Sequence, residues 1–280
     1  MKKILKSVQR PAELERFVLR HPVGDPSHNW GSARHAKKAV QQQLYHDQRG
    51  LCAYCEISLT FASPGNIGDI SVEHFHPESD KTCDWAFMWS NMLGVCKGGR
   101  EKNLTEQERV ATGSTDYERK LNQHCDGPKG NDILDEIILN PLKIKTTESL
   151  FSIEIRQVIK DGNRVSTAID LVPIFAICEK EGENCYQKAK ETIRRLHLNC
   201  DLLGEFRYKA IEKIKIQLKD LMKNDKLTFE DAAKFLMKQY FDNTLTDDMG
   251  KPNWPPFFTT IRTYYKDFVE PRLKEIGYEG

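Results

Sequence analysis

The sequence predicts an α+β fold that is mostly helical, with a small zinc-stapled core between two helical regions. Three observations predict this fold. Five of the eight cysteines gather between residues 52 and 125, and two of them have the C-x₂-C spacing typical of a zinc site. The later part of the chain carries apolar residues at helical spacing. Between these parts, only short stretches alternate as strands do.

The composition fits a globular protein with one large domain or two modest ones. The chain has 280 residues, of which 39% are hydrophobic and 30% are charged. No apolar run approaches the roughly 20 residues that a membrane span needs. The basic N-terminus lacks the apolar stretch of a signal peptide. We therefore expect a cytoplasmic protein without membrane contact, whose cysteines do not form a disulfide framework.

Residues 1–49 are predicted to form a basic helical arm. The first 51 residues hold five Lys and five Arg against two Glu and two Asp, although the whole chain has a net charge of +1. Weakly periodic apolar residues predict a helix over 32–50, with Gly50 as its stop. Such an arm suits a polyanion. The alternative is an ordinary solvated helix face.

Residues 50–145 form the predicted core, which carries the polar motifs. The stretch "ISVEHFHP", residues 70–77, ends at a proline and predicts a short strand. The apolar and aromatic stretch 83–96 contains the polar Asn91. The other predicted elements are a loop at 63–69, a helix beginning at "LTEQERVA" with Thr105 and Glu108 as its capping box, and a turn at 124–132.

Residues 146–280 are predicted to form a hairpin followed by helices, a region suited to docking a partner. The stretch 149–167 alternates around Asp161-Gly162, a pair that favours a tight turn. From about residue 186 the pattern is helical. The expected helices lie within 201–222, over 228–241 with Thr228 and Asp231 as its cap, and after the Pro-rich loop 250–258. The apolar stripe of the first helix is Leu203, Phe206, Ala210, Ile214, Leu218 and Leu221.

Four cysteines are predicted to hold a structural zinc. The turn "CAYC" can present two thiolates to one ion, and the other two ligands usually come from a second element. The separation between the third and fourth cysteines is longer than a second knuckle needs, so Cys83 or His124 in place of the fourth stays open. Cys83 is otherwise expected to be a free thiol. The predicted ligands are Cys52, Cys55, Cys96 and Cys125.

The motif "VEHFHP" has residues suited to hydrolysis of a phosphodiester. That reaction needs a base to activate water and a cation to stabilise the charge that develops on oxygen. Histidine titrates near neutrality and suits the base, whereas hard oxygen ligands suit Mg²⁺. Neighbouring side chains on a strand point to opposite faces. Glu73 and His74 therefore serve one site only where the strand ends, as Pro77 indicates.

The order "CAYC … EHFHP … SNMLGVC … CDGPK" over residues 50–131 resembles the HNH endonucleases, which have a ββα-metal fold. This resemblance implies that His74 is the general base, that Glu73 is an acidic metal ligand, and that Asn91 holds the loop and orients the base. It also implies that Lys129 contacts a substrate phosphate. Asp126 stands where the family has Asn or His as the last ligand of the catalytic Mg²⁺ or Mn²⁺.

His76 departs from the family pattern, which usually has an apolar residue at this position. The simpler interpretation is a packed or surface histidine. The functional alternative is a contact with a substrate phosphate, or an accessory metal ligand.

The rest of the chain resembles the HNH proteins of Septu-type phage-defence systems, the PtuB-like family, some of which are encoded beside retrons. The stretches that carry the resemblance include "KKAVQQQLYHDQRGLCAYCE", "IILNPL" and "TIRRLHLNCDLLGEFR". It implies a nuclease effector with a PtuA-like ABC/SMC-type ATPase as partner, joined in retron versions by a reverse transcriptase with its RNA–DNA product. DNA is the first expected substrate, and RNA, including tRNA, is the second.

Two other functions compete with this interpretation. One is a zinc-stapled nucleic-acid-binding or adaptor subunit without catalysis, which would not need the set Glu73, His74, Asn91 and Asp126. The other is a zinc hydrolase with an open metal position, which a closed set of four cysteines disfavours.

Overall fold

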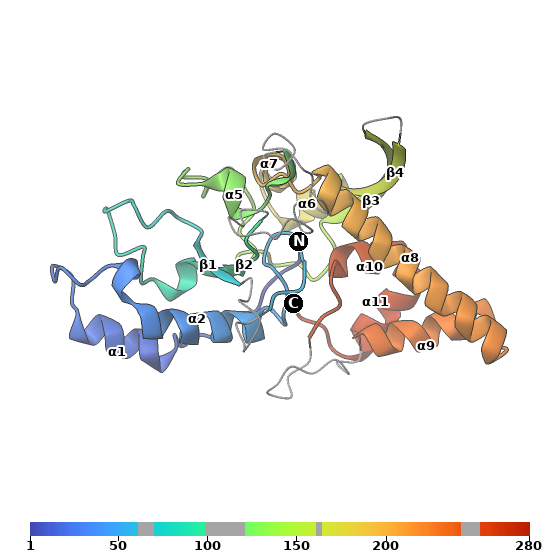
Figure 1. The fold of residues 1–280 in the computed structure, drawn as a ribbon, viewed down its shortest axis with the longest axis horizontal. Helices are drawn as coiled ribbons and strands as arrows, with labels where there is room; N and C mark the ends of the chain where they lie inside the picture. The colour runs from blue at the N-terminus through green and yellow to red at the C-terminus, as the bar shows by residue number, and fades with distance from the viewer. Residues whose placement is uncertain (61–69, 99–120, 161–163, 242–252) are drawn as a thin grey trace.

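The computed structural model describes residues 1–60, 70–98, 121–160, 164–241 and 253–280, a mostly helical protein with two small antiparallel sheets. In Figure 1 the N-terminal helices and the first sheet lie at one end, the long C-terminal helices lie at the other, and both termini lie near the middle. The elements are α1 (Ala12–Arg20), η1 (Trp30–Ser32), α2 (Arg34–Asp47), β1 (Ser71–His74), η2 (Trp89–Asn91), β2 (Met92–Val95), α5 (Asp126–Lys129), β3 (Phe151–Lys160), β4 (Arg164–Pro173), α6 (Phe175–Glu181), α7 (Cys185–Arg195), α8 (Asp201–Asn224), α9 (Phe229–Phe241), α10 (Phe258–Tyr264) and α11 (Lys266–Glu275).

The predicted helix over 32–50 is confirmed as α2, which packs against α1 and the first sheet. Its buried side chains recur three to four residues apart, as a one-sided helix requires. They join a small apolar core that also holds residues from the stretch before β2, so the basic arm is packed against the core region. The fully buried members of this core are Leu14, Ala33, Ala36, Val40, Leu44, Phe87 and Met92.

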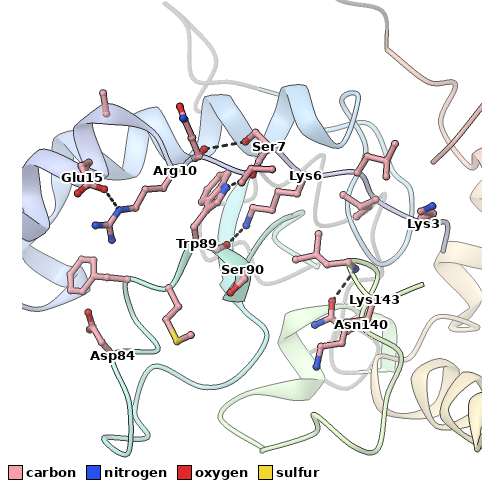
Figure 2. Close-up of a pocket in the computed structure, with 18 residues that line it drawn as sticks. Lys3, Lys6, Ser7, Arg10, Glu15, Asp84, Trp89, Ser90, Asn140 and Lys143 are labelled. Carbon is pink, nitrogen blue, oxygen red and sulfur yellow. Dashed lines mark hydrogen bonds and ion pairs between the residues drawn. The ribbon is translucent and has the colours of Figure 1, made fainter. Parts of the chain in front are cut away.

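Residues 1–10 run as an irregular strap over the segment that leads into β2 (Figure 2). The Lys6 ammonium donates to the carbonyls of Trp89 and Met92 and lies 3.6 Å from the Trp89 ring centroid. The Trp89 indole donates back to the Ser7 carbonyl at 2.7 Å. Burial lowers the pKa of Lys6 to about 7. A cavity of about 1240 Å³ lies between the strap, residues 84–90 and the 140–143 turn.

The first sheet consists of β1 and β2, which pair antiparallel from Ser71 opposite Val95 to His74 opposite Met92. The predicted strand over 70–77 is confirmed for its first part, and it ends at His74 rather than at Pro77. Beyond His74 the Asn91 side chain replaces the backbone of the partner strand. Its amide oxygen accepts from the His76 backbone N–H, and its amide nitrogen donates to the His76 carbonyl. The strand therefore ends where the polar motif begins.

The predicted hairpin is confirmed as β3 and β4, paired from Phe151 opposite Pro173 to Lys160 opposite Arg164. Helix α8 lies across β4, where Gly204 permits a close approach: a Cβ on Gly204 would lie 2.8 Å from the Ala168 Cβ. The predicted stripe of α8 is buried or half-buried throughout. Pattern reasoning missed Arg207, which lies in the same buried face.

Helix α9 confirms the prediction over 228–241, and Thr228 caps it by accepting from the Asp231 backbone N–H at 3.1 Å. The predicted final helix is two helices, α10 and α11, divided near Tyr265. Helical structure begins at α6, earlier than the predicted residue 186. Three predicted features lie outside the described residues: the loop at 63–69, the helix at "LTEQERVA" and the Asp161-Gly162 turn.

The division into regions 1–49, 50–145 and 146–280 stays a prediction. No helix in the described ranges is long and apolar enough to cross a membrane.

Candidate functional site

The four predicted zinc ligands come together in the core. Cys52 and Cys55 lie in the turn after α2, Cys96 follows β2, and Cys125 precedes α5. All four are buried, and their sulfur atoms lie within 4.8 Å of one another. The Sγ–Sγ distances are 3.7 Å for Cys52–Cys125, 3.6 Å for Cys55–Cys96 and 3.8 Å for Cys96–Cys125.

This geometry fits a tetrahedral zinc. Zinc–sulfur bonds of about 2.3 Å place the sulfurs of a tetrahedron about 3.8 Å apart, whereas a disulfide needs about 2.05 Å. Burial opposes ionisation of Cys55, yet contacts with the other three thiols and with His124 hold its pKa well below the usual value. A dication would ionise all four thiols. Cys83 is exposed and lies outside the group. The His124 ring is buried and contacts Cys55, but among the described residues the four cysteines are the set whose ligand atoms lie close enough together to share a zinc.

Gly98 lets the chain turn between the third and fourth cysteines. Its φ is +55°, and an added Cβ would lie 2.1 Å from the His124 carbonyl oxygen. The His124 backbone N–H donates to the Gly98 carbonyl at 3.1 Å, directly before Cys125. The close approach of these two segments brings Cys125 to the other three sulfurs.

We expect Gly98→Ala to lower the free energy of unfolding by at least about 2 kcal/mol and to weaken zinc binding, because the methyl group pushes the two segments apart. Chelator competition and thermal unfolding measure both effects. Gly130→Ala is the matched control, since Gly130 has φ +56° but nothing within 4 Å of an added Cβ. Equal losses in the two variants would show that backbone strain alone acts.

His74 lies at the end of β1, beside the β2 segment that leads to the cysteine cluster. Its Nε2 lies 3.0 Å from the Ala86 carbonyl oxygen, and its side chain is 7% exposed. Because a carbonyl only accepts, Nε2 carries a proton, and in the neutral ring Nδ1 therefore has the lone pair. Burial lowers the pKa of His74, and its ring packs nearly perpendicular to the Trp30 ring, with centroids 5.1 Å apart. Burial therefore favours the neutral ring, the form that a base requires.

Asn91 fixes the backbone around this histidine. Its Oδ1 accepts from the His76 backbone N–H at 2.7 Å, and its Nδ2 donates to the carbonyls of His76 and Trp85 at 2.9 and 3.0 Å. Trp85 precedes Ala86, which holds the His74 ring. Asn91 thus ties together both segments that position His74.

We expect Asn91→Ala to lower the free energy of unfolding by about 3 kcal/mol, because it leaves one donor and two acceptors without partners in a buried place. Urea denaturation measures this loss. Asn140→Ala removes a single side-chain bond, to the Leu142 backbone N–H, and should cost about 1 kcal/mol. A loss in Asn91→Ala no larger than in this control would contradict the clamp.

Glu73 and Lys129 form a buried ion pair behind the strand. The Lys129 ammonium lies 2.9 Å from Glu73 Oε1 and donates to the His74 carbonyl at 3.2 Å. Lys129 is 2% exposed, which differs from the expectation that it reaches a substrate phosphate. A buried ammonium needs a compensating charge, and Glu73 supplies it. This contact also packs α5 against β1.

Glu73 and Asp126 have hard carboxylate oxygens, which fit Mg²⁺ or Mn²⁺ in donor chemistry. The pKa of the fully buried Tyr54 is raised, mainly by burial and next by the negative charge of Glu73. The charge of Asp126 adds a smaller effect, so both carboxylates lie near this tyrosine. Within the described residues, the cysteine set is the only group of three or more ligands close enough to share an ion. Mg²⁺ keeps several waters and needs only one or two protein carboxylates. Glu73 and Asp126 are therefore enough carboxylates for such an ion.

His76 lies between two carboxylates. Its Nδ1 is 3.0 Å from Asp135 and its Nε2 is 3.0 Å from Asp80, while its ring stacks on Trp85 with centroids 4.0 Å apart. Both ring nitrogens are engaged by carboxylates, and a contact of His76 with a phosphate or a metal stays a prediction. The packed-histidine interpretation describes its environment better: His76 joins the loop after β1 to the segment after α5.

The fold and the site together define a class of protein: it is mostly helical, and its buried four-cysteine cluster lies next to a short strand that carries a histidine and a carboxylate. The chain is similar to an Escherichia coli protein named "Retron Ec83 putative HNH endonuclease", with 29% identity over 224 residues. The match covers 74% of this chain and 79% of that protein. No family model matches the chain, and no solved structure matches it.

Proposed function

We propose that the protein is a divalent-metal-dependent HNH endonuclease that hydrolyses phosphodiester bonds. The observation that carries the proposal is His74, a buried histidine whose Nε2 donates to the Ala86 carbonyl, which leaves Nδ1 to act as the base. It stands beside Glu73 and is clamped by Asn91, as in the motif order of that family. The similarity to the retron Ec83 protein supports a nuclease of this kind.

In this proposal His74 Nδ1 takes the proton from the attacking water. Asn91 keeps the base in place through the backbone of His76 and Trp85. Glu73 and Asp126 would hold a Mg²⁺ or Mn²⁺ ion, which supplies stabilisation of the charge on the scissile phosphate when bound. Lys129 holds the Glu73 carboxylate in position. A zinc held by Cys52, Cys55, Cys96 and Cys125 would be structural, because four cysteines leave no open position on the metal.

Partners and context belong to the same proposal. The name of the relative supports a retron setting. A reverse transcriptase with its RNA–DNA product as partner rests on the sequence resemblance. A PtuA-like ABC/SMC-type ATPase of the Septu kind, a role in antiphage defence and a cytoplasmic location rest on the sequence resemblance. The region from β3 to the last helix is the proposed docking surface for these partners.

Incubation of the purified protein, alone and with its ATPase, with plasmid DNA, single-stranded DNA and total tRNA tests the function. We expect cutting of at least one of them with Mg²⁺ or Mn²⁺ and none after chelation by EDTA. Binding of nucleic acid without any cutting under all conditions would instead support the non-catalytic adaptor.

A further inference from the structure

Glu78 has a carboxylate at the base nitrogen of His74, although no motif marks it. Its Oε2 lies 3.7 Å from His74 Nδ1, the nitrogen that keeps the lone pair. The Glu78 side chain is 46% exposed and the His74 side chain only 7%. Nδ1 therefore faces a carboxylate whose side chain is half-exposed.

The separation of the two groups suits a shared water better than a direct bond. A charge-assisted N–H···O bond spans about 2.7–2.9 Å, well below the observed 3.7 Å. One water that donates both hydrogens over about 2.8 Å would hold its two acceptors about 4.4 Å apart. A small rotation of a half-exposed glutamate covers the difference. Nδ1 and the carboxylate are both acceptors, as such a water requires.

We infer, on the basis of the proposed function, that Glu78 is a positioning residue that accepts the second hydrogen of the attacking water. With both hydrogens held, the lone pairs of the water point away from the protein and toward the phosphorus. As the new P–O bond forms, the first proton moves to His74 Nδ1. The bond to the leaving oxygen breaks and its electron pair stays on that oxygen. Glu78 gains no proton, and its charge stabilises the imidazolium.

The environment of Glu73 sets Glu78 apart from the proposed metal ligands. Glu73 is buried and paired with Lys129 behind the strand, whereas Glu78 lies on the loop after Pro77. An effect of Glu78 on the attacking water should change the rate of the chemical step and leave metal and substrate binding as they are.

The test compares Glu78→Gln and Glu78→Ala with wild type and with Asp132→Asn, an exposed carboxylate in the turn after α5. We expect kcat to fall about 10- to 100-fold in both Glu78 variants, with KM, Mn²⁺ affinity and thermal stability unchanged. Glu78→Asp should recover part of the rate. The loss should persist on bis(p-nitrophenyl) phosphate, whose leaving group needs no assistance, because the defect lies with the nucleophile.

The outcomes separate this inference from the function on which it rests. Wild-type kcat in both Glu78 variants, with His74→Ala inactive, would overturn the inference and leave the nuclease in place. Weakened Mn²⁺ binding in Glu78→Gln, measured by electron paramagnetic resonance, would make Glu78 a metal ligand and also overturn it. Absence of cutting by wild type in every condition would remove both.

Discussion

His74→Ala should lower phosphodiester hydrolysis by about 10²- to 10⁴-fold, because it removes the proposed general base. The fold should persist, since the ring makes a single hydrogen bond, to the Ala86 carbonyl, and packs under Trp30. Initial rates on the preferred nucleic acid, with thermal unfolding of the same samples, measure both quantities. The variant should also bind the nucleic acid with unchanged affinity, because His74 is almost fully buried.

The control for this experiment is His35→Ala, which removes an exposed histidine from α2. It should cut at the wild-type rate. If His74→Ala cut nucleic acid at the wild-type rate, the HNH assignment would be wrong, despite the sequence similarity to the retron Ec83 protein. A joint loss of rate and of thermal stability would make His74 a residue of the core.

Loss of one cysteine of the cluster should have the largest effect on stability. Cys55→Ser or Cys96→Ser removes a thiolate from a closed four-sulfur site, and structural zinc sites contribute on the order of 10–16 kcal/mol of binding free energy that is coupled to folding. We expect these variants to be purified without zinc and to unfold at much lower temperature. The wild-type protein should contain about one zinc per chain, measured by elemental analysis.

Cys83→Ser is the matched control, because Cys83 is exposed and lies outside the cluster. It should keep both the zinc and the thermal stability. Full zinc content after the double change Cys52→Ser and Cys55→Ser would contradict the site. Addition of a strong chelator to wild type should reproduce the behaviour of the cysteine variants, since metal loss and ligand loss act on the same state.

Local sequence patterns predicted the elements that local chemistry determines. The helix over 32–50, the hairpin and the Thr228 cap follow from periodicity and turn chemistry, and the structure contains all three. The cysteine set was predictable because each cysteine flanks a turn or a strand end. These features depend on residues close together in the chain, or on a strict demand for metal ligands.

Contacts between distant residues could not be predicted in the same way. Nothing in the sequence indicates that Lys129 turns inward to Glu73, because that choice depends on the packing of α5 against β1. The burial of Arg207 also depends on distant contacts. Its guanidinium donates to the carbonyls of Ile169 and Leu198 inside the core, and the spacing of residues along α8 does not predict these contacts. Glu78 faces His74 only because the chain bends after Pro77.

The strap of residues 1–10 contacts the backbone segment that leads into β2, next to the candidate site. Lys6 bonds the carbonyls of Trp89 and Met92, on either side of Asn91. Asn91 in turn holds the backbone next to His74, so a series of hydrogen bonds runs from the N-terminal segment to the backbone around the base. The backbone that positions the base is therefore held from the N-terminal segment as well as from the core.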